Sequence, residues 1–195
     1  MKCEKCNLHL TCKSPCIMGT GNPKAKVMLV GEAPGYDEDK KGVPFVGVAG
    51  QLLDFILYKL GIEREDLYIT NLIKCRPPNN TLPKASELKE IVESCKPHLM
   101  SEIKQVKPKV VVTLGGTATA SLTGVRFISK CEGLVLPMEH TKIKTVACYH
   151  PAYVLRSPSK ESNIARALFK AMTIAGMKLK PKGMETGVFD YEIRG

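Results

Sequence analysis

Gly31-Glu32-Ala33-Pro34-Gly35 follows the apolar run Lys26-Val27-Met28-Leu29-Val30 and precedes Pro44-Phe45-Val46-Gly47-Val48-Ala49-Gly50. The apolar run predicts a buried strand, and the glycine and proline residues after it predict a loop at the carboxyl end of that strand. Ligand sites in open α/β sheets form at such strand ends. The sequence therefore predicts that this loop forms one wall of a binding pocket.

The alternation of strand and helix continues along the chain. We expect core strands at residues 26–30, 67–73, 108–114 and 143–148, and helices at residues 49–60, 84–105, 115–122 and 161–177. Pro97 predicts a kink or a division into two helices within residues 84–105, and residues 125–136 are ambiguous but contain a β excursion. This order predicts an α/β fold: a single domain of three α/β/α layers around a central, mainly parallel four-stranded sheet. Residues 1–177 form this domain, and residues 178–195 are a C-terminal tail rich in Lys, Pro and Gly.

The composition favours a polyanionic partner without identifying it. The chain has 195 residues, 44% of them hydrophobic, which is enough for one substantial core. The 29 Lys and Arg outnumber the 19 Asp and Glu and give a net charge of +10, which suits a nucleic acid but also suits an ordinary solvated lysine surface. Neither a secretory signal nor a membrane-spanning run is evident, so we expect a cytoplasmic protein that does not contact membranes.

The eight cysteines favour metal ligation or buried thiols over disulfides in such a protein. Cys3, Cys6, Cys12 and Cys16 are close enough in sequence to form a local zinc site, and Cys75 and Cys95 lie far downstream. A Cys-x-x-Cys pair alone does not identify the metal. We expect the two remaining cysteines, Cys131 and Cys148, to be small buried apolar residues.

Three polar residues lie near or just after the carboxyl end of a predicted strand, namely Glu32, Asn71 and His150. A parallel sheet brings the ends of its strands to one edge, so these side chains should converge on one pocket. Each residue alone is more typical of a turn or a cap than of a catalytic site. The prediction of a site therefore depends on their convergence.

The ordered match of Gly31 to Gly35, Glu38-Asp39, Gly42 and Pro44 to Gly47, read with Ile69-Thr70-Asn71 and Tyr149-His150-Pro151, resembles the uracil-DNA glycosylase superfamily. The likeness is greatest to its family-four members, which carry an iron–sulfur cluster, and it extends from Cys3 to about Pro158. It implies a monofunctional enzyme that flips uracil out of single- and double-stranded DNA and hydrolyses the N-glycosidic bond. The product is an abasic site, which initiates base-excision repair. The resemblance further implies a monomer.

The resemblance assigns roles to the pocket residues. Phe45 would stack on the flipped base, Asn71 would pair with the uracil edge, and His150 would donate to the developing uracil anion. An amide suits uracil because its oxygen accepts from N3–H while its nitrogen donates to O4. Glu38 would fill the space that a thymine methyl needs, and the backbone of Gly31, Ala33 and Gly35 would complete the uracil site.

Ala33 stands where the best-known uracil glycosylases have Asp, a difference that is itself typical of family four. Glu32 is then the nearest carboxylate for orienting water, and it is equally compatible with a role in shaping the loop. The arginine-rich insertion of the branch that traps abasic DNA covalently is missing after this motif.

The resemblance also implies which residues contact DNA. Residues 149–158 resemble the loop that enters the minor groove, with Leu155 or Arg156 as the wedge that replaces the flipped base. Arg76 lies in the loop that the cluster would hold beside the DNA. Independently of the resemblance, Gly115 precedes a predicted helix and could offer its N–H to a phosphate.

By the same resemblance, Cys3, Cys6, Cys75 and Cys95 are the four thiolate ligands of a [4Fe–4S] cluster with a structural role. The interval from Cys75 to Cys95 is about one helical turn longer than is usual in the family. Two other classes of protein stay open at this point. One is a non-catalytic iron–sulfur protein that binds nucleic acid or senses redox state, and the other is a nucleotide-binding zinc protein.

Overall fold

The computed structural model describes residues 3–179. Its sheet has six strands in the order β1-β3-β2-β4-β6-β5. The four inner strands are parallel: β2 (Val27–Gly31), β3 (Tyr68–Asn71), β4 (Val110–Leu114) and β6 (Lys144–Cys148). These are the four strands that the sequence predicts. Two short antiparallel strands, β1 (Thr20–Gly21) and β5 (Val135–Pro137), extend the edges, so the expected number of four is wrong because such short strands carry no readable periodicity.

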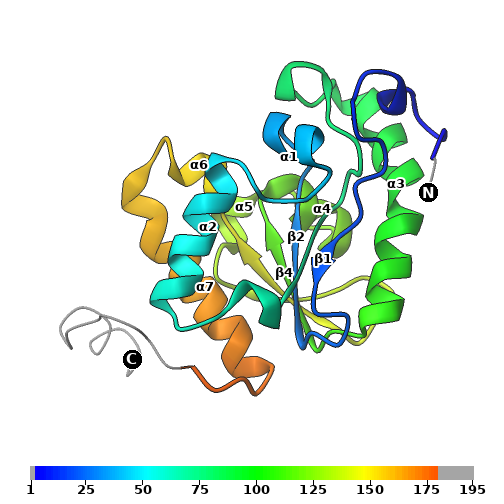
Figure 1. Ribbon diagram of the computed structural model, residues 1–195. Helices are drawn as coiled ribbons and strands as arrows, with labels where there is room; N and C mark the ends of the chain where they lie inside the picture. Colours follow the sequence, from blue (N-terminus) through cyan, green and yellow to red (C-terminus); the bar gives the residue numbers. More distant parts are fainter. Residues whose placement is uncertain (1–2, 180–195) are drawn as a thin grey trace.

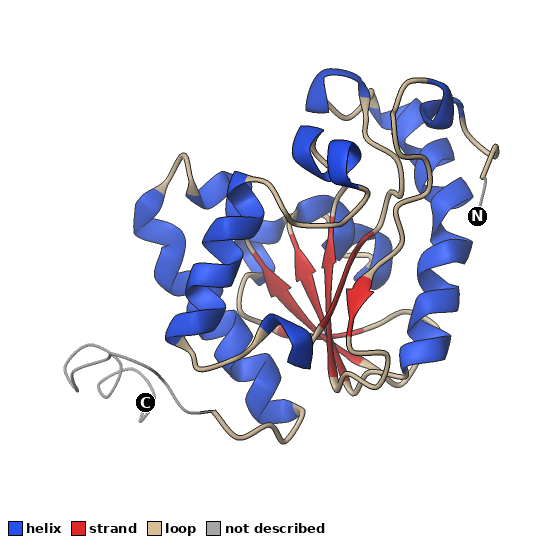
Figure 2. Cartoon of the chain, in the orientation of Figure 1, coloured by secondary structure: helices blue, strands red, loops and turns tan. Residues whose placement is uncertain are grey.

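Helices cover both faces of the sheet (Figures 1 and 2). One face carries α2 (Val48–Lys59), α6 (Pro151–Val154) and α7 (Glu161–Ile174), and the other carries α3 (Ala85–Val106) and α4 (Gly116–Thr123). Within residues 3–179 the chain also forms α1 (Tyr36–Lys41), α5 (Ile128–Cys131) and four short 3-10 helices at Asn7–Leu10, Arg64–Asp66, Pro78–Asn80 and Pro158–Lys160. The predicted three-layer α/β/α arrangement is confirmed.

The strand side chains alternate between the two faces. Val27 and Leu29 of β2 pack with α2 and α7, whereas Met28 and Val30 pack with α3 and α4. Every residue of β2 and β4 is buried, as expected for parallel strands covered on both faces. The continuous apolar runs in the sequence therefore correspond to strands at the centre of the molecule.

Pro97 lies within α3, which continues from Ala85 to Val106 as a single helix. The alternative of two helices is therefore wrong. Ile91, Cys95, Leu99 and Ile103 recur every four residues and are all buried against the sheet, and this packing favours one helix although proline removes a backbone hydrogen bond. The β excursion expected within residues 125–136 is confirmed by β5, which follows α5.

The parallel strands end together at one edge of the sheet, and the loops that follow them form the site. Gly31 and Asn71 are register partners at the ends of β2 and β3, and Leu114 and Cys148 are partners at the ends of β4 and β6. None of the helices within residues 3–179 is long and apolar enough to span a membrane. The predicted C-terminal tail lies outside the described residues beyond Leu179.

Candidate active site

A cavity of about 650 Å³ opens at the carboxyl edge of the sheet. The loops after β2, β3, β4 and β6 all contribute to its wall, so the predicted convergence of Glu32, Asn71 and His150 is confirmed. Six other residues singled out from the sequence also line it, namely Ala33, Gly35, Glu38, Phe45, Gly115 and Arg156. Gly31, Arg76 and Leu155 are not among the lining residues.

Asn71 is the last residue of β3, and its side chain is only 2% exposed. Its Oδ1 is buried without a hydrogen-bond partner anywhere in residues 3–179. A buried polar atom left unpaired is costly, so such an atom in the wall of a cavity points to a ligand that pairs with it.

Gly31 keeps the space between Asn71 and Phe45 open. A Cβ atom built on Gly31 would lie 2.3 Å from Asn71 Oδ1 and 2.5 Å from Phe45 Cζ. Any side chain at this position would therefore displace one of the two groups. Gly31 shapes the site although it does not line the cavity itself.

Phe45 is buried and has a left-handed backbone conformation, with φ of 54°. This conformation is unusual for a bulky residue and requires support from its surroundings. Part of the support is Gly50, because a Cβ there would lie 2.1 Å from the Phe45 carbonyl oxygen. The Phe45 ring lies 5.8 Å from the His150 ring between centroids, inclined by 32°, so the two aromatic side chains stand together in the pocket wall.

Glu38 stabilises the loop that carries Phe45. Its Oε1 accepts hydrogen bonds from the backbone N–H groups of Val46 (2.9 Å) and Gly47 (2.8 Å), and its Oε2 accepts one from Gly35 (3.0 Å). Glu38 is in the first turn of α1, where the helix dipole also favours a carboxylate. Both oxygens are thus committed to the backbone, a role that the sequence did not predict beside the steric one.

His150 is held as a neutral imidazole with a defined tautomer. Its Nδ1 accepts a hydrogen bond from the backbone N–H of Ala152 at 3.1 Å. Burial lowers the pKa of His150 to about 4, an effect opposed by the charge of Glu38 and reinforced by Arg156. At neutral pH the proton of the imidazole is therefore on Nε2, which is left as a hydrogen-bond donor.

Glu32 receives a hydrogen bond that the sequence did not predict. The hydroxyl of Thr117, in the first turn of α4, donates to Glu32 Oε2 at 2.5 Å. The two residues come from loops after different strands, 85 positions apart, and no local pattern connects them. The contact fixes one oxygen of a carboxylate that lines the cavity.

The four predicted DNA-contacting residues differ in their exposure and in their contacts. Leu155 is 45% exposed and follows α6, and the neighbouring Arg156 is exposed at the cavity wall. Arg76 is half-buried, donates to Asn80 Oδ1 at 2.7 Å, and lies over the Tyr36 ring. Gly115 departs from the expectation, because its N–H donates to the Cys148 carbonyl and is not available to a phosphate. Its φ of 101° and its closeness to His150 give it a structural reason to be glycine.

Cysteines near the N-terminus lie close to Cys75 and to Cys95, which is on α3. Cys75 accepts a hydrogen bond from the backbone N–H of Cys16 at 3.3 Å, and the Cys12 thiol lies nearby. Burial raises the pKa of Cys75 to about 12 and that of Cys95 to about 11, with smaller effects from nearby Cys6 on both. The Sγ atom of Cys3 lies 3.2 Å from Nε2 of His98, which is on α3. Within the described residues, no three or more His, Cys, Asp or Glu side chains are placed to hold a metal ion.

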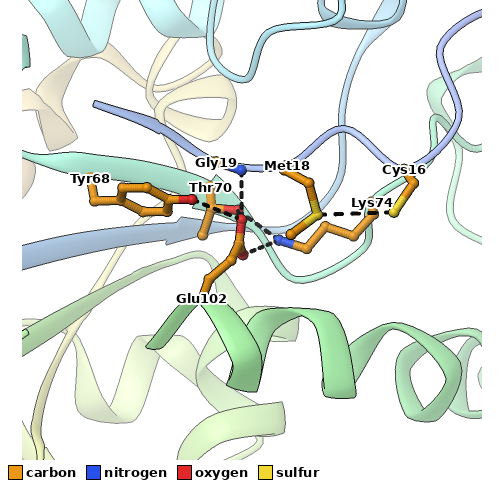
Figure 3. Close-up of polar contacts among 7 residues, drawn as sticks. All are labelled: Cys16, Met18, Gly19, Tyr68, Thr70, Lys74 and Glu102. Carbon is orange, nitrogen blue, oxygen red and sulfur yellow. Dashed lines mark hydrogen bonds and ion pairs between the residues drawn. The ribbon is translucent and has the colours of Figure 1, made fainter. Parts of the chain in front are cut away.

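A buried ion pair lies beside these cysteines (Figure 3). Lys74 Nζ is 2.5 Å from Glu102 Oε2, and each side chain is 1% exposed. The Glu102 carboxylate also accepts hydrogen bonds from the hydroxyls of Tyr68 and Thr70 and from the backbone N–H of Gly19. This carboxylate therefore connects α3 to β3, to the loop that carries Cys75, and to the N-terminal segment.

Comparison with known proteins gives consistent matches over most of the chain. Residues 18–173 match the model of the uracil DNA glycosylase superfamily. The chain is 42% identical to the type-4 uracil-DNA glycosylase of Archaeoglobus fulgidus, over 98% of this chain and 94% of that protein. It is 41% identical to the proteins of the same name from Pyrobaculum aerophilum, over 85% of this chain and 86% of that protein, and from Thermotoga maritima, over 82% and 81%.

Proposed function

The chain belongs to the uracil-DNA glycosylase superfamily, and we propose that the cavity at the carboxyl edge of its sheet binds uracil flipped out of DNA. It is a uracil-DNA glycosylase, a hydrolase of N-glycosyl bonds that acts in DNA repair, like the type-4 relatives that it matches. A base inside a duplex cannot present its glycosidic bond, so the enzyme must receive it in a pocket.

The unpaired Oδ1 of Asn71 is the observation that carries this proposal. Uracil N3–H is a donor of the kind that this oxygen lacks, and the side-chain nitrogen can donate to uracil O4. Phe45 offers a ring for stacking on the base at the same pocket wall. Asn71 would thus orient the hydrogen-bonding edge of uracil, and Phe45 would orient the plane of its ring.

His150 would stabilise the leaving group. Breaking the bond between uracil N1 and the sugar C1′ moves the bonding electrons onto the base, and negative charge spreads to its carbonyl oxygens. The neutral imidazole, with its Nδ1 engaged by Ala152, has Nε2–H free to donate to such an oxygen. A donor aimed at charge that develops in the transition state lowers the barrier.

Glu32 would act on the sugar side of the reaction. Its carboxylate lines the cavity and is held by Thr117. A carboxylate there would orient a water molecule toward C1′ and stabilise the positive charge on the sugar. The water supplies the hydroxyl of the abasic product, and the uracil anion is finally protonated.

Cys3, Cys6, Cys75 and Cys95 would hold a [4Fe–4S] cluster, which the relatives' type-4 name favours. The donor set suits it chemically, since all four residues are thiols, the usual ligands of iron–sulfur clusters, and burial separates Cys75 and Cys95 from solvent. When bound, the cluster would supply a structural link between the N-terminal segment and the Cys75 loop. The thiols must lose their protons to bind it.

Release of free uracil from DNA tests the function directly. We expect the purified monomer to release uracil from both single-stranded and duplex DNA, leaving abasic sites without strand cleavage. His150→Ala should lower the single-turnover rate about a hundredfold while duplex affinity changes little. Weakened binding with an unchanged rate at saturation would instead make His150 a DNA-positioning residue.

A further inference from the structure

The hydrogen bond from Thr117 to Glu32 joins two loops of the pocket. The Thr117 hydroxyl lies 2.5 Å from Glu32 Oε2, whereas Oε1 receives no hydrogen bond from any residue in the described range 3–179. One carboxylate oxygen is thus fixed by the protein, and the other remains able to accept a proton or a hydrogen bond.

The position of Thr117 is itself well fixed. Two residues further along α4, the Thr119 hydroxyl donates to the Gly115 carbonyl at 2.8 Å and contacts the Thr113 hydroxyl of β4 at 2.8 Å. These contacts are buried and connect the first turn of α4 to the end of β4. A threonine side chain also has few χ1 choices in a helix, so its hydroxyl is a rigid donor.

We propose that Thr117 is a positioning residue for uracil excision, which holds Glu32 so that its second oxygen accepts a hydrogen bond from the attacking water. This inference rests on the proposed role of the cavity. It explains how a carboxylate in a loop, without a neighbouring Asp at Ala33, would keep one orientation through the reaction.

The water oxygen forms a bond to C1′ as the bond from C1′ to uracil N1 breaks, and the electron pair of that bond leaves with the base. One water proton passes to Glu32 Oε1, and solvent later removes it. The uracil anion takes up a proton from solvent. In the net reaction, the hydroxyl group of one water molecule is added to the sugar and one proton is added to the base.

The test compares Thr117→Val, which removes the hydroxyl but keeps the shape, with Thr117→Ser, which keeps the hydroxyl. Thr117→Ala is the second variant should valine disturb the helix, and Thr173→Val, on the exposed face of α7, is the matched control. For Thr117→Val we expect a ten- to hundredfold lower single-turnover rate with unchanged affinity for uracil-containing duplex. Thr117→Ser should stay within about threefold of the parent rate.

A double-mutant cycle distinguishes positioning from a merely structural role. If Thr117 acts through Glu32, then Thr117→Val should have almost no further effect on the rate in a Glu32→Gln background. A parental rate in Thr117→Val, or the same loss in both backgrounds, would overturn the inference. Failure of the unaltered protein to release any uracil would be a different result and would reject the proposed function itself.

Discussion

Gly31 and Asn71 face each other as the last register partners of β2 and β3, and a Cβ atom on Gly31 would approach Asn71 Oδ1 to 2.3 Å. The space beside the unpaired Asn71 oxygen therefore exists because residue 31 is glycine. A base edge can reach Asn71 only while position 31 has no side chain.

Gly31→Ala should abolish most uracil release and leave the fold intact. The added methyl group meets Asn71 on one side and Phe45 Cζ, 2.5 Å away, on the other. Neither neighbour is the free end of a flexible surface side chain, so the base site closes. Single-turnover release, measured with duplex affinity and a thermal melt, checks this expectation, and a parental rate would show that uracil binds elsewhere.

Asn71→Asp should lower the rate of uracil release by about a hundredfold or more. A carboxylate cannot donate to uracil O4 and repels the charge that develops on the base. Asn22→Asp is a suitable control, because the Asn22 side chain accepts a hydrogen bond from the backbone N–H of Lys24, and a carboxylate can do the same. Equal rates for the Asn71 variant and the parent would contradict the assignment of this residue to the base edge.

Glu38→Ala should loosen the loop around Phe45, because three backbone N–H groups lose their acceptor. We expect a loss of about 2–3 kcal/mol in the free energy of unfolding, alongside slower release of uracil. If Glu38 also excludes the thymine methyl, the variant should release some thymine. Urea unfolding and assays of uracil and thymine release measure these effects, with Glu65→Ala as the control. Unchanged discrimination between uracil and thymine would reject the steric role of Glu38 but not its role in holding the loop.

His150 should make folding sensitive to acid. Burial lowers its folded pKa from 6.5 to about 4, so its contribution to stability is complete above pH 6.5 and is lost as the pH falls toward 4. In that window the unfolded chain takes up a proton that the folded chain does not. Between pH 7 and pH 4, the parent should lose about 3 kcal/mol more unfolding free energy than His150→Gln. Urea titrations at the two pH values measure this difference. If the parent and His150→Gln lose the same unfolding free energy, His150 is not held neutral in the folded protein.

Serine at Cys3, Cys6, Cys75 or Cys95 should remove iron and the brown colour, whereas serine at Cys12 or Cys16 should retain both. The Cys12 variant is the sharpest test, because its thiol lies close to Cys75 without being a predicted ligand. Cys131→Ser is the control, since that thiol only donates to backbone carbonyls, as a hydroxyl can. Iron retained in the Cys95 variant and lost in the Cys12 variant would require a different ligand set.

The sequence predicted the four inner strands and the gathering of Glu32, Asn71 and His150, because continuous apolar runs and the residues after them are local signals. Contacts between distant loops left no such signal. Thr117 reads only as the start of a helix, and Glu102 reads as a solvated helix residue, although it is 1% exposed. The hydrogen bonds that Glu38 accepts from backbone N–H groups depend on the turn around Phe45. That turn requires a left-handed φ at Phe45, which its residue type does not predict.

The Lys74–Glu102 pair has a consequence for how the protein matures. Lys74 immediately precedes Cys75, and Glu102 lies about two turns after Cys95 on α3, so their attraction joins the two distant predicted iron ligands through protein alone. Removing either partner would leave a buried charge without its counterpart, which is strongly destabilising. Cys75 and Cys95 are therefore held in the fold by protein contacts alone. Binding of the predicted cluster would then require Cys3 and Cys6, at the start of the chain, to approach two thiols that are already in place.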